Sequence, residues 1–395
     1  MPANSVSIAM ICTLLLSLVV AADPPPATQP PLAPEWGKIE MDSQHPGTYR
    51  LVVDRWPDSG KLDLPPGLPH LMSGQWRQGD NTAPVEFEFN ADATMRAILP
   101  VDRRPPMKEA ILQTAEKTQQ FADGRILFHA ADAKVIGATA KLETHPGNAR
   151  IGFWSNAEDS VTWNYDATRW GRYQALLTYS NGSPKGSEIE LEFGGEKLRA
   201  TLNSTGSWYR YTTLNLGSLY LAKGGKTTLT IRCTKLVGPA VMNLKGVSLL
   251  PACEGTPPIQ ADDGSITLHS RDSTVEGTVL RYEPDPKKLT LGYWVKASDA
   301  GLWRFTAKQP GEFEVEVLQG CGTGQGGSDA RVTVAGQSLD FVVDDTGHFQ
   351  NFKPRVIGKV KLEKPGTYEL RIQPQKIAKS AAMDIRQVRL LPVKK

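Results

Sequence analysis

Cysteine is scarce in this sequence, and neither sign of charge dominates. The 395 residues include four Cys, and 45 Lys plus Arg stand against 42 Asp plus Glu, a formal charge of +3. A charge this balanced, without a basic arm or an RNA-binding motif, argues against a nucleic-acid partner. Outside the N-terminal apolar stretch the sequence holds Cys233, Cys253 and Cys321. At most one disulfide can form among them, so one Cys233–Cys253 bond and three free thiols are both open.

No apolar run is long enough to span a membrane, which takes about 20 residues. The apolar stretch at 10–22 is shorter and ends in small residues. We therefore expect residues 1–22 to be a signal peptide and the protein to be secreted, either to a periplasm or outside the cell. Residues 23–35 are rich in proline, which predicts an extended linker.

The common signatures of catalysis are missing as well. The sequence contains no Gly-x-Ser-x-Gly, no His-Glu-x-x-His and no nucleotide-binding fingerprint. We expect no catalytic residue, no cofactor and no bound metal. A pair of carboxylates for glycoside cleavage has no diagnostic spacing in a sequence, so a hydrolase or lyase acting on a sandwich surface stays an open alternative.

The sequence does contain an internal repeat. Each copy is about 130 residues long, enough for a core of its own, so residues 121–253 (copy 1) and 254–395 (copy 2) are predicted to be tandem domains. The matching positions lie 140 residues apart at first and 141 apart after one net insertion: Ile151-Gly-Phe-Trp154 with Leu291-Gly-Tyr-Trp294, Asp159 with Asp299, Trp163 with Trp303, Thr205-Gly206 with Thr346-Gly347, and Met242-Asn243 with Met383-Asp384.

The periodicity within each copy is that of half-buried strands. Apolar and charged residues alternate over 188–193 and 313–317, which predicts antiparallel strands with one face toward a core. Residues 36–120 contain similar runs, and 106–112 allow a short helical turn. The predicted fold class is all-β. It comprises three consecutive β-sandwich domains, a small one at 36–120 and the two copies, of galactose-binding-like or jelly-roll type.

Four repeated tryptophans are candidates for carbohydrate recognition, because an indole face stacks well on the C–H face of a sugar ring. Trp163 and Trp303 begin strand-like runs and are expected to fill the cores. Trp154 and Trp294 each follow a Gly-aromatic pair and precede a polar loop. They are the better candidates for exposed binding residues.

Two further repeated features could contact a ligand. In copy 1, a turn is followed by Trp208 and Tyr211, two aromatics that could face one ligand from a loop. Asn243 lies in an apolar strand and needs a partner, which is either the backbone or a ligand hydroxyl. The corresponding residues of copy 2 are Phe349, Phe352 and Asp384.

Residues 45–392 resemble the non-catalytic regions of secreted bacterial α-L-fucosidases. Trp56-Pro-Asp-Ser-Gly-Lys-Leu-Asp-Leu-Pro65 is similar to the β-sandwich that follows the fucosidase barrel. The repeated Gly-aromatic-Trp and Met-Asn/Asp-aliphatic patterns are similar to carbohydrate-binding-like modules appended to such enzymes. The barrel itself, about 250 residues, is missing. The resemblance therefore implies an ancillary, glycan-directed protein that binds through Trp208, Tyr211 and Asn243, as sandwich modules of the family-six type do.

These observations predict a secreted, non-catalytic protein that binds a polysaccharide or other glycan. Two modules would add avidity toward a repeated epitope. A separately encoded glycoside hydrolase is the expected companion. The alternatives are a structural or cell-surface assembly protein without sugar binding, and the surface hydrolase or lyase mentioned above.

Overall fold

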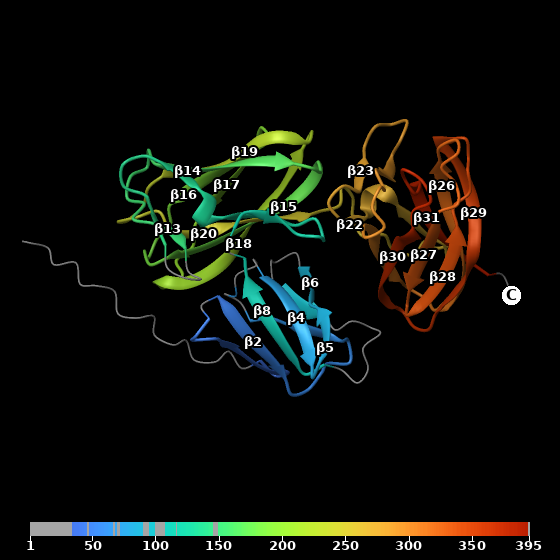
Figure 1. Ribbon diagram of the computed structural model, residues 1–395, viewed down its shortest axis with the longest axis horizontal. Coiled ribbons are helices and arrows are strands. Elements are labelled where there is room, and N and C mark those ends of the chain that lie inside the picture. Colours follow the sequence, from blue (N-terminus) through green and yellow to red (C-terminus); the bar gives the residue numbers. More distant parts are fainter. Residues whose placement is uncertain are drawn as a thin grey trace, which may run out of the picture.

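The computed structural model describes residues 34–45, 47–65, 68, 72–89, 95–98, 107–115, 117–144 and 149–393. The predicted signal peptide and residues 23–33 of the linker lie outside these ranges. Within them, the regular structure is β-strand apart from the 3₁₀ helices η1 (Ala130–Asp132) and η2 (Ser270–Asp272). The strands form three successive bodies (Figure 1). The prediction of an all-β chain of sandwiches is confirmed.

The N-terminal body packs a five-stranded sheet, in the order β1-β2-β8-β4-β5, with a three-stranded sheet, in the order β3-β7-β6. The predicted helical turn at 106–112 is wrong where the structure describes it. Residues 109–114 form β8, because Ala110 and Leu112 alternate into the core with 0% exposure. The strands are β1 (Gly37–Met41), β2 (Thr48–Val53), β3 (Lys61–Asp63), β4 (Met72–Gln78), β5 (Asn81–Pro84), β6 (Glu86–Phe89), β7 (Met95–Ile98) and β8 (Glu109–Thr114).

Copy 1 is a sandwich of a seven-stranded and a five-stranded antiparallel sheet. The first holds β12, β13, β20, β10 and β9 with β15 and β18, and the second runs β11-β14-β19-β16-β17. The strands are β9 (Gln119–Gln120), β10 (Ile126–His129), β11 (Lys134–Ile136), β12 (Lys141–Glu143), β13 (Arg150–Gly152), β14 (Ser160–Ala167), β15 (Gly171–Asn181), β16 (Glu188–Phe193), β17 (Glu196–Thr201), β18 (Ser207–Leu221), β19 (Gly225–Lys235) and β20 (Asn243–Pro251).

Copy 2 repeats this pairing except that its larger sheet has six strands and lacks a counterpart of β9, with β23-β24-β31-β26-β29 plus β21 in one sheet and β22-β25-β30-β27-β28 in the other. The insertion lies in the loop between β26 and β27. The strands are β21 (Ile266–His269), β22 (Thr274–Glu276), β23 (Arg281–Glu283), β24 (Thr290–Gly292), β25 (Ala300–Ala307), β26 (Gly311–Cys321), β27 (Asp329–Val334), β28 (Gln337–Val342), β29 (His348–Leu362), β30 (Gly366–Lys376) and β31 (Asp384–Pro392).

The boundary before copy 1 lies slightly earlier than the sequence indicated. Gln119 and Gln120 were assigned to the first domain, but they form β9, which pairs with β10 of copy 1. The hydroxyl of Thr118 also accepts a hydrogen bond from the backbone N–H of His129 at 3.0 Å. Copy 1 therefore includes the residues just before position 121.

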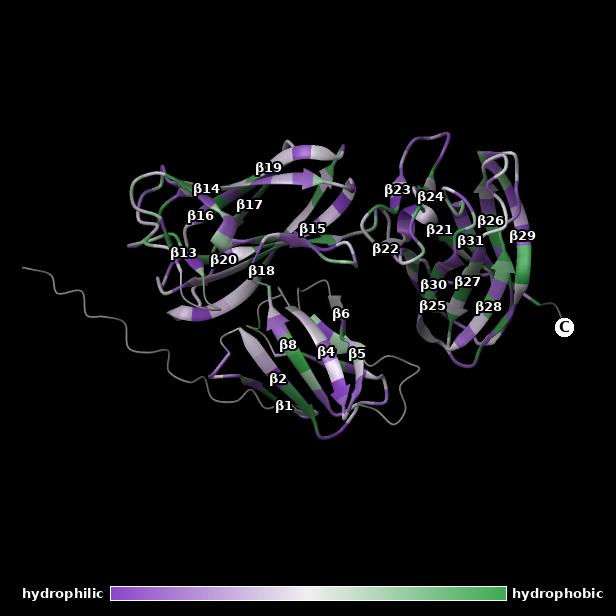
Figure 2. Cartoon of the chain, viewed as in Figure 1, coloured by the Kyte–Doolittle hydropathy of each residue, from purple (hydrophilic) through white to green (hydrophobic). Residues whose placement is uncertain are grey.

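The cores lie between the paired sheets. Trp163 and Trp303 are 2% and 0% exposed, as expected for core residues, and their indole N–H groups donate to the backbone oxygens of His129 and His269. Apolar and polar residues are interleaved along many strands (Figure 2), as half-buried strands require. The three cysteines of the described chain are free thiols. None of its helices is long and apolar enough to cross a membrane.

Candidate functional site

Four strand ends of copy 1 meet at one end of its larger sheet. β13 and β15 end there, and β18 and β20 begin there. The antiparallel register places Ser180 opposite Asn243, and Asn181 opposite Ser207. This topology gathers Trp208, Tyr211 and Asn243, which are distant in sequence, at the same end of the module.

The partner of Asn243 is the backbone at the start of β18, where Trp208 lies. The Asn243 amide donates to the Trp208 carbonyl oxygen at 2.8 Å, and the Ser180 hydroxyl donates to the same oxygen at 2.6 Å. Asn243 is 8% exposed. The half-buried Trp208 indole packs on Gly182, where any side chain would collide with it. Asn243 thus helps to fix the position of the start of β18.

Tyr211 belongs to a polar cluster on the outer face of the sheet. The Lys245 ammonium lies 4.9 Å from the centre of its ring. Burial, together with the nearby charge of Arg150, lowers the pKa of Lys245 to about 8. Arg150 is paired with Glu143 at 2.7 Å and also lies over the ring of Tyr209. Tyr211 is therefore a half-buried member of this cluster and not an exposed platform.

The prediction that Trp154 and Trp294 are exposed is wrong, since both side chains are 0% exposed. The preceding aromatics, Phe153 and Tyr293, adopt left-handed backbone angles, with φ of 54° and 63°. This turn directs each tryptophan into the core and the preceding aromatic outward, leaving Phe153 60% and Tyr293 43% exposed. The exposed aromatic could have been found in the sequence as the residue that precedes Trp in each Gly-aromatic-Trp motif.

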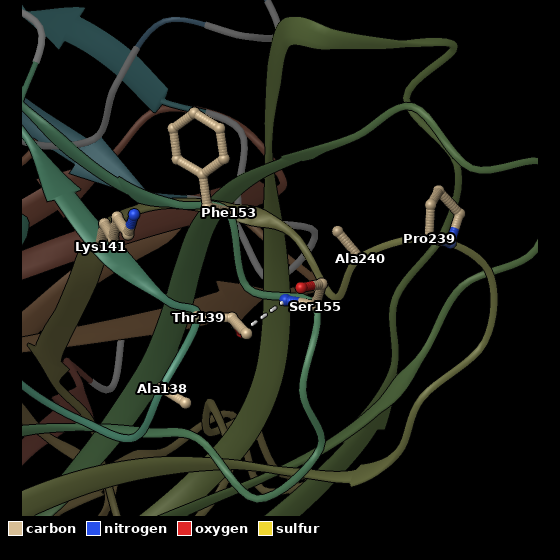
Figure 3. Close-up of a pocket in the computed structure, with 7 residues that line it drawn as sticks. All are labelled: Ala138, Thr139, Lys141, Phe153, Ser155, Pro239 and Ala240. Carbon is tan, nitrogen blue, oxygen red and sulfur yellow. Dashed lines mark hydrogen bonds between the residues drawn. The ribbon is translucent and has the colours of Figure 1, made fainter. Parts of the chain in front are cut away.

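Phe153 borders a pocket of about 370 Å³ (Figure 3). A backbone hydrogen bond of 2.7 Å from Val241 to the carbonyl of Trp154 draws the 239–240 loop beside it. The Ser155 N–H donates to the Thr139 hydroxyl at 3.1 Å in the middle of the pocket. The pocket is lined by Ala138, Thr139, Lys141, Phe153, Ser155, Pro239 and Ala240.

Asp159 holds the wall of this pocket. Its buried carboxylate accepts hydrogen bonds from the backbone N–H groups of Ala138, Thr139 and Ala140 and from the Thr139 hydroxyl, at 2.6 to 2.9 Å. Burial alone would raise the pKa of Asp159, but these four donors lower it to about 2. Asp159 therefore positions pocket residues and is itself only 1% exposed.

The predicted residues of copy 2 lie in a different environment. Phe349 is half-buried against Gly322, and Phe352 lies under the guanidinium of Arg386 at 4.1 Å. Asp384 is 5% exposed, and burial, with the charge of Glu283, raises its pKa to about 7. None of the three offers an open aromatic face beside a pocket like that of copy 1.

Copy 2 has a pocket of its own on another side, with a volume of about 480 Å³. It includes none of the predicted site residues. Its lining consists of His269, Ser270, Arg271, Tyr282, Leu289, Arg386 and Gln387. Over the described part of the chain, no group of three or more His, Cys, Asp or Glu side chains is arranged to hold a metal ion.

Comparison with known proteins gives similarities in structure only. No protein-family model matches the chain, and neither does any curated protein sequence. A family 35 carbohydrate-binding module from Clostridium thermocellum is similar over 33% of this chain and 99% of its own, with 18% identity and a TM-score of 0.29.

Two larger enzymes are also similar to parts of the chain. A GH26-CBM35 β-(1,4)-mannanase of Podospora anserina matches 36% of this chain and 30% of its own, with 15% identity and a TM-score of 0.29. A Paenibacillus xanthan lyase matches 90% of this chain and 35% of its own, with 12% identity and a TM-score of 0.31. The chain thus spans about a third of each enzyme. Its fold assignment rests on its own strand pairing.

Proposed function

We propose that this is a secreted carbohydrate-binding protein that binds a saccharide through the Phe153 pocket of copy 1. The observation that carries the proposal is the exposed ring of Phe153. A bulky residue at φ 54° costs about 1–3 kcal/mol of backbone strain. The fold gains no core packing from a side chain that is 60% exposed. Such strain is typical of functional positions.

The pocket supplies what a sugar ring needs. The ring of Phe153 offers an apolar face for C–H groups, and Lys141 and Thr139 line the pocket with groups that can hydrogen-bond to hydroxyls. Its volume of about 370 Å³ is at the small end of ligand pockets and suits one or two sugar rings. Trp208 and Asn243 would form part of the neighbouring surface and support the residues that line the pocket.

Two parts of the proposal, the polysaccharide ligand and the companion glycoside hydrolase, are argued from the sequence. The resemblance of residues 45–65 to a fucosidase β-sandwich supports a role beside a separately encoded glycoside hydrolase. The proposed action is recognition of a polysaccharide, with no chemical step.

A glycan array followed by isothermal titration would test the pocket. Phe153→Ala should weaken binding of the best array ligand at least tenfold, because burying a Phe ring against a ligand contributes about 1.5–3 kcal/mol. Phe153→Tyr, which copies the residue of copy 2, should retain binding. Val356→Ala serves as the control, because Val356 is 51% exposed on copy 2. Unchanged binding by Phe153→Ala would remove the proposed site, and a silent array would favour the structural alternative.

A further inference from the structure

Copy 2 repeats the exposed aromatic residue of copy 1. We call the rings of Phe153 and Tyr293 the aromatic platforms of copy 1 and copy 2. Tyr293 corresponds to Phe153 and has the same unusual backbone, and Arg281 corresponds to Lys141. Lys141 is exposed beside the pocket of copy 1, whereas Arg281 is only 1% exposed. The two copies thus share the platform but differ in what covers it.

A residue of copy 1 contacts the platform of copy 2 and leaves the Tyr293 side chain 43% exposed. Trp170 lies edge-on to Tyr293, with ring centres 5.3 Å apart and an interplanar angle of 70°. The guanidinium carbon of Arg281 lies 3.1 Å from the ring centre of Trp170 and 3.2 Å from that of Tyr293. One cation is thus held between two aromatic rings, an arrangement whose attraction is strengthened by burial.

The residues next to Trp170 anchor this contact to the backbone of copy 2. The buried Arg169 side chain donates to the carbonyl of Leu280 at 2.9 Å. The hydroxyl of Thr168 donates to the carbonyl of Thr278 at 3.0 Å. Thr278 and Leu280 flank the position that corresponds to Thr139 of the copy 1 pocket. Segment 168–170, between β14 and β15, therefore docks on the same loop end that is open in copy 1.

Copy 2 has no corresponding segment that could cover a neighbour. Its residues at 308–310 are Lys-Gln-Pro, so proline stands where copy 1 has Trp170. The backbone N–H groups of Lys308 and Gln309 are bound to the Gln260 side chain of copy 2 itself. The aromatic cap is thus a feature of copy 1 alone.

We infer that copy 2 carries a second saccharide site, built on the face of Tyr293 that Arg281 covers while Trp170 of copy 1 packs on Arg281. This inference rests on the proposed function of the Phe153 pocket. Because the cap is tethered, its effective concentration is in the millimolar range or above, and a weakly bound sugar does not displace it. The chain then has one open site, and the covered face of Tyr293 becomes free when the two copies separate.

The test uses the full chain with Phe153→Ala, in which copy 1 no longer binds. Adding Trp170→Ala and Arg281→Lys removes the cap and restores the lysine of copy 1. The opened variant should bind the array ligand at one site per chain, at least tenfold more tightly than Phe153→Ala alone. A further Tyr293→Ala change should abolish that binding.

A folded opened variant that stays silent toward a ligand of the wild type would overturn the inference and leave the proposed function intact. Wild-type silence would instead count against the Phe153 site, and binding by the opened variant would still support the site in copy 2. Circular dichroism establishes folding. If the alanine variant is unfolded, Trp170→Leu with Arg281→Lys keeps apolar packing at the joint, and the same binding outcome is required of it.

Discussion

Apart from β9, which only copy 1 has, the two copies have the same strands in the same order, yet their equivalent loop ends lie in different surroundings. In copy 1, Phe153 projects into solvent beside a pocket. In copy 2, Tyr293 supports a buried arginine and contacts Trp170 of the other copy. The difference shows that equivalent loop ends of a duplicated sandwich can be exposed in one copy and engaged in an inter-domain contact in the other. The expectation of two modules adding avidity is therefore replaced by the proposal of one open and one closed site.

The polar residue at the start of the last strand shows the same divergence. Asn243 donates to a backbone carbonyl, which a carboxylate cannot do. Asp384, its counterpart, accepts a long 3.4 Å hydrogen bond from Gln350 and has a pKa of about 7. The Asp384 carboxyl of copy 2 is therefore uncharged only below about pH 7. Copy 1 has an amide at this position, which is uncharged at every pH.

The largest expected effect is from Asp384→Asn, which makes copy 2 like copy 1. A carboxyl whose pKa is raised in the folded state stabilises the protein below its unfolded pKa near 4, and this stability is lost as the pH rises through 7. A rise of three units corresponds to about 4 kcal/mol. Asp384→Asn should therefore stabilise copy 2 by up to about 4 kcal/mol at pH 8 and change little at pH 4. Calorimetry at both pH values measures this, and equal shifts at the two would refute it.

Asp159→Ala should cost on the order of 3 kcal/mol of copy 1 stability, because it leaves several buried donors without their acceptor. The equivalent Asp299→Ala should cost less, since Asp299 accepts longer backbone bonds of 3.4 and 3.1 Å. Because the pKa of Asp159 is lowered to about 2, its contribution is present above pH 4 and disappears as the pH falls toward 2. Chemical denaturation of both variants checks the order, and a larger loss for Asp299→Ala would contradict it.

Gly124→Ala should loosen the joint between the copies by about 2 kcal/mol. A methyl group at Gly124 would collide with the carbonyl oxygen of Gly277 in copy 2, and its φ of 88° adds strain. Gly264→Ala is a matched control, because its φ is 85° but its methyl group would meet only Pro392, at 3.4 Å. It should cost about 1 kcal/mol. Small-angle scattering and limited proteolysis should detect the looser joint only in Gly124→Ala.

The repeat and the β periodicity predicted the fold because both can be recognised directly in the sequence, without knowledge of how the finished domains pack. Trp163 and Trp303 could be assigned to the cores for the same reason. Trp154 and Trp294 could not, because the alternation of inward and outward residues breaks at the left-handed Phe153 and Tyr293. The turn predicted at 106–112 failed because pairing of β8 with β2 and β4 outweighed local helix propensity.

The contact of Trp170 with copy 2 could not be predicted from the sequence. Nothing in the pattern around Trp170 indicates that it meets Tyr293, since that contact depends on how two finished domains dock. The resemblance to family-six sandwich modules implied that Trp208, Tyr211 and Asn243 lie in one region, and the strand register brings them to one end of the larger sheet. It could not show which of them is buried.

The most direct test of the central claim is the number of ligand molecules bound per chain. Titration of the wild-type protein with the best glycan from the array should give one site, and Phe153→Ala should reduce the binding at least tenfold. Two equivalent sites in the wild type, or one site that survives Phe153→Ala, would contradict the assignment of the open site to copy 1.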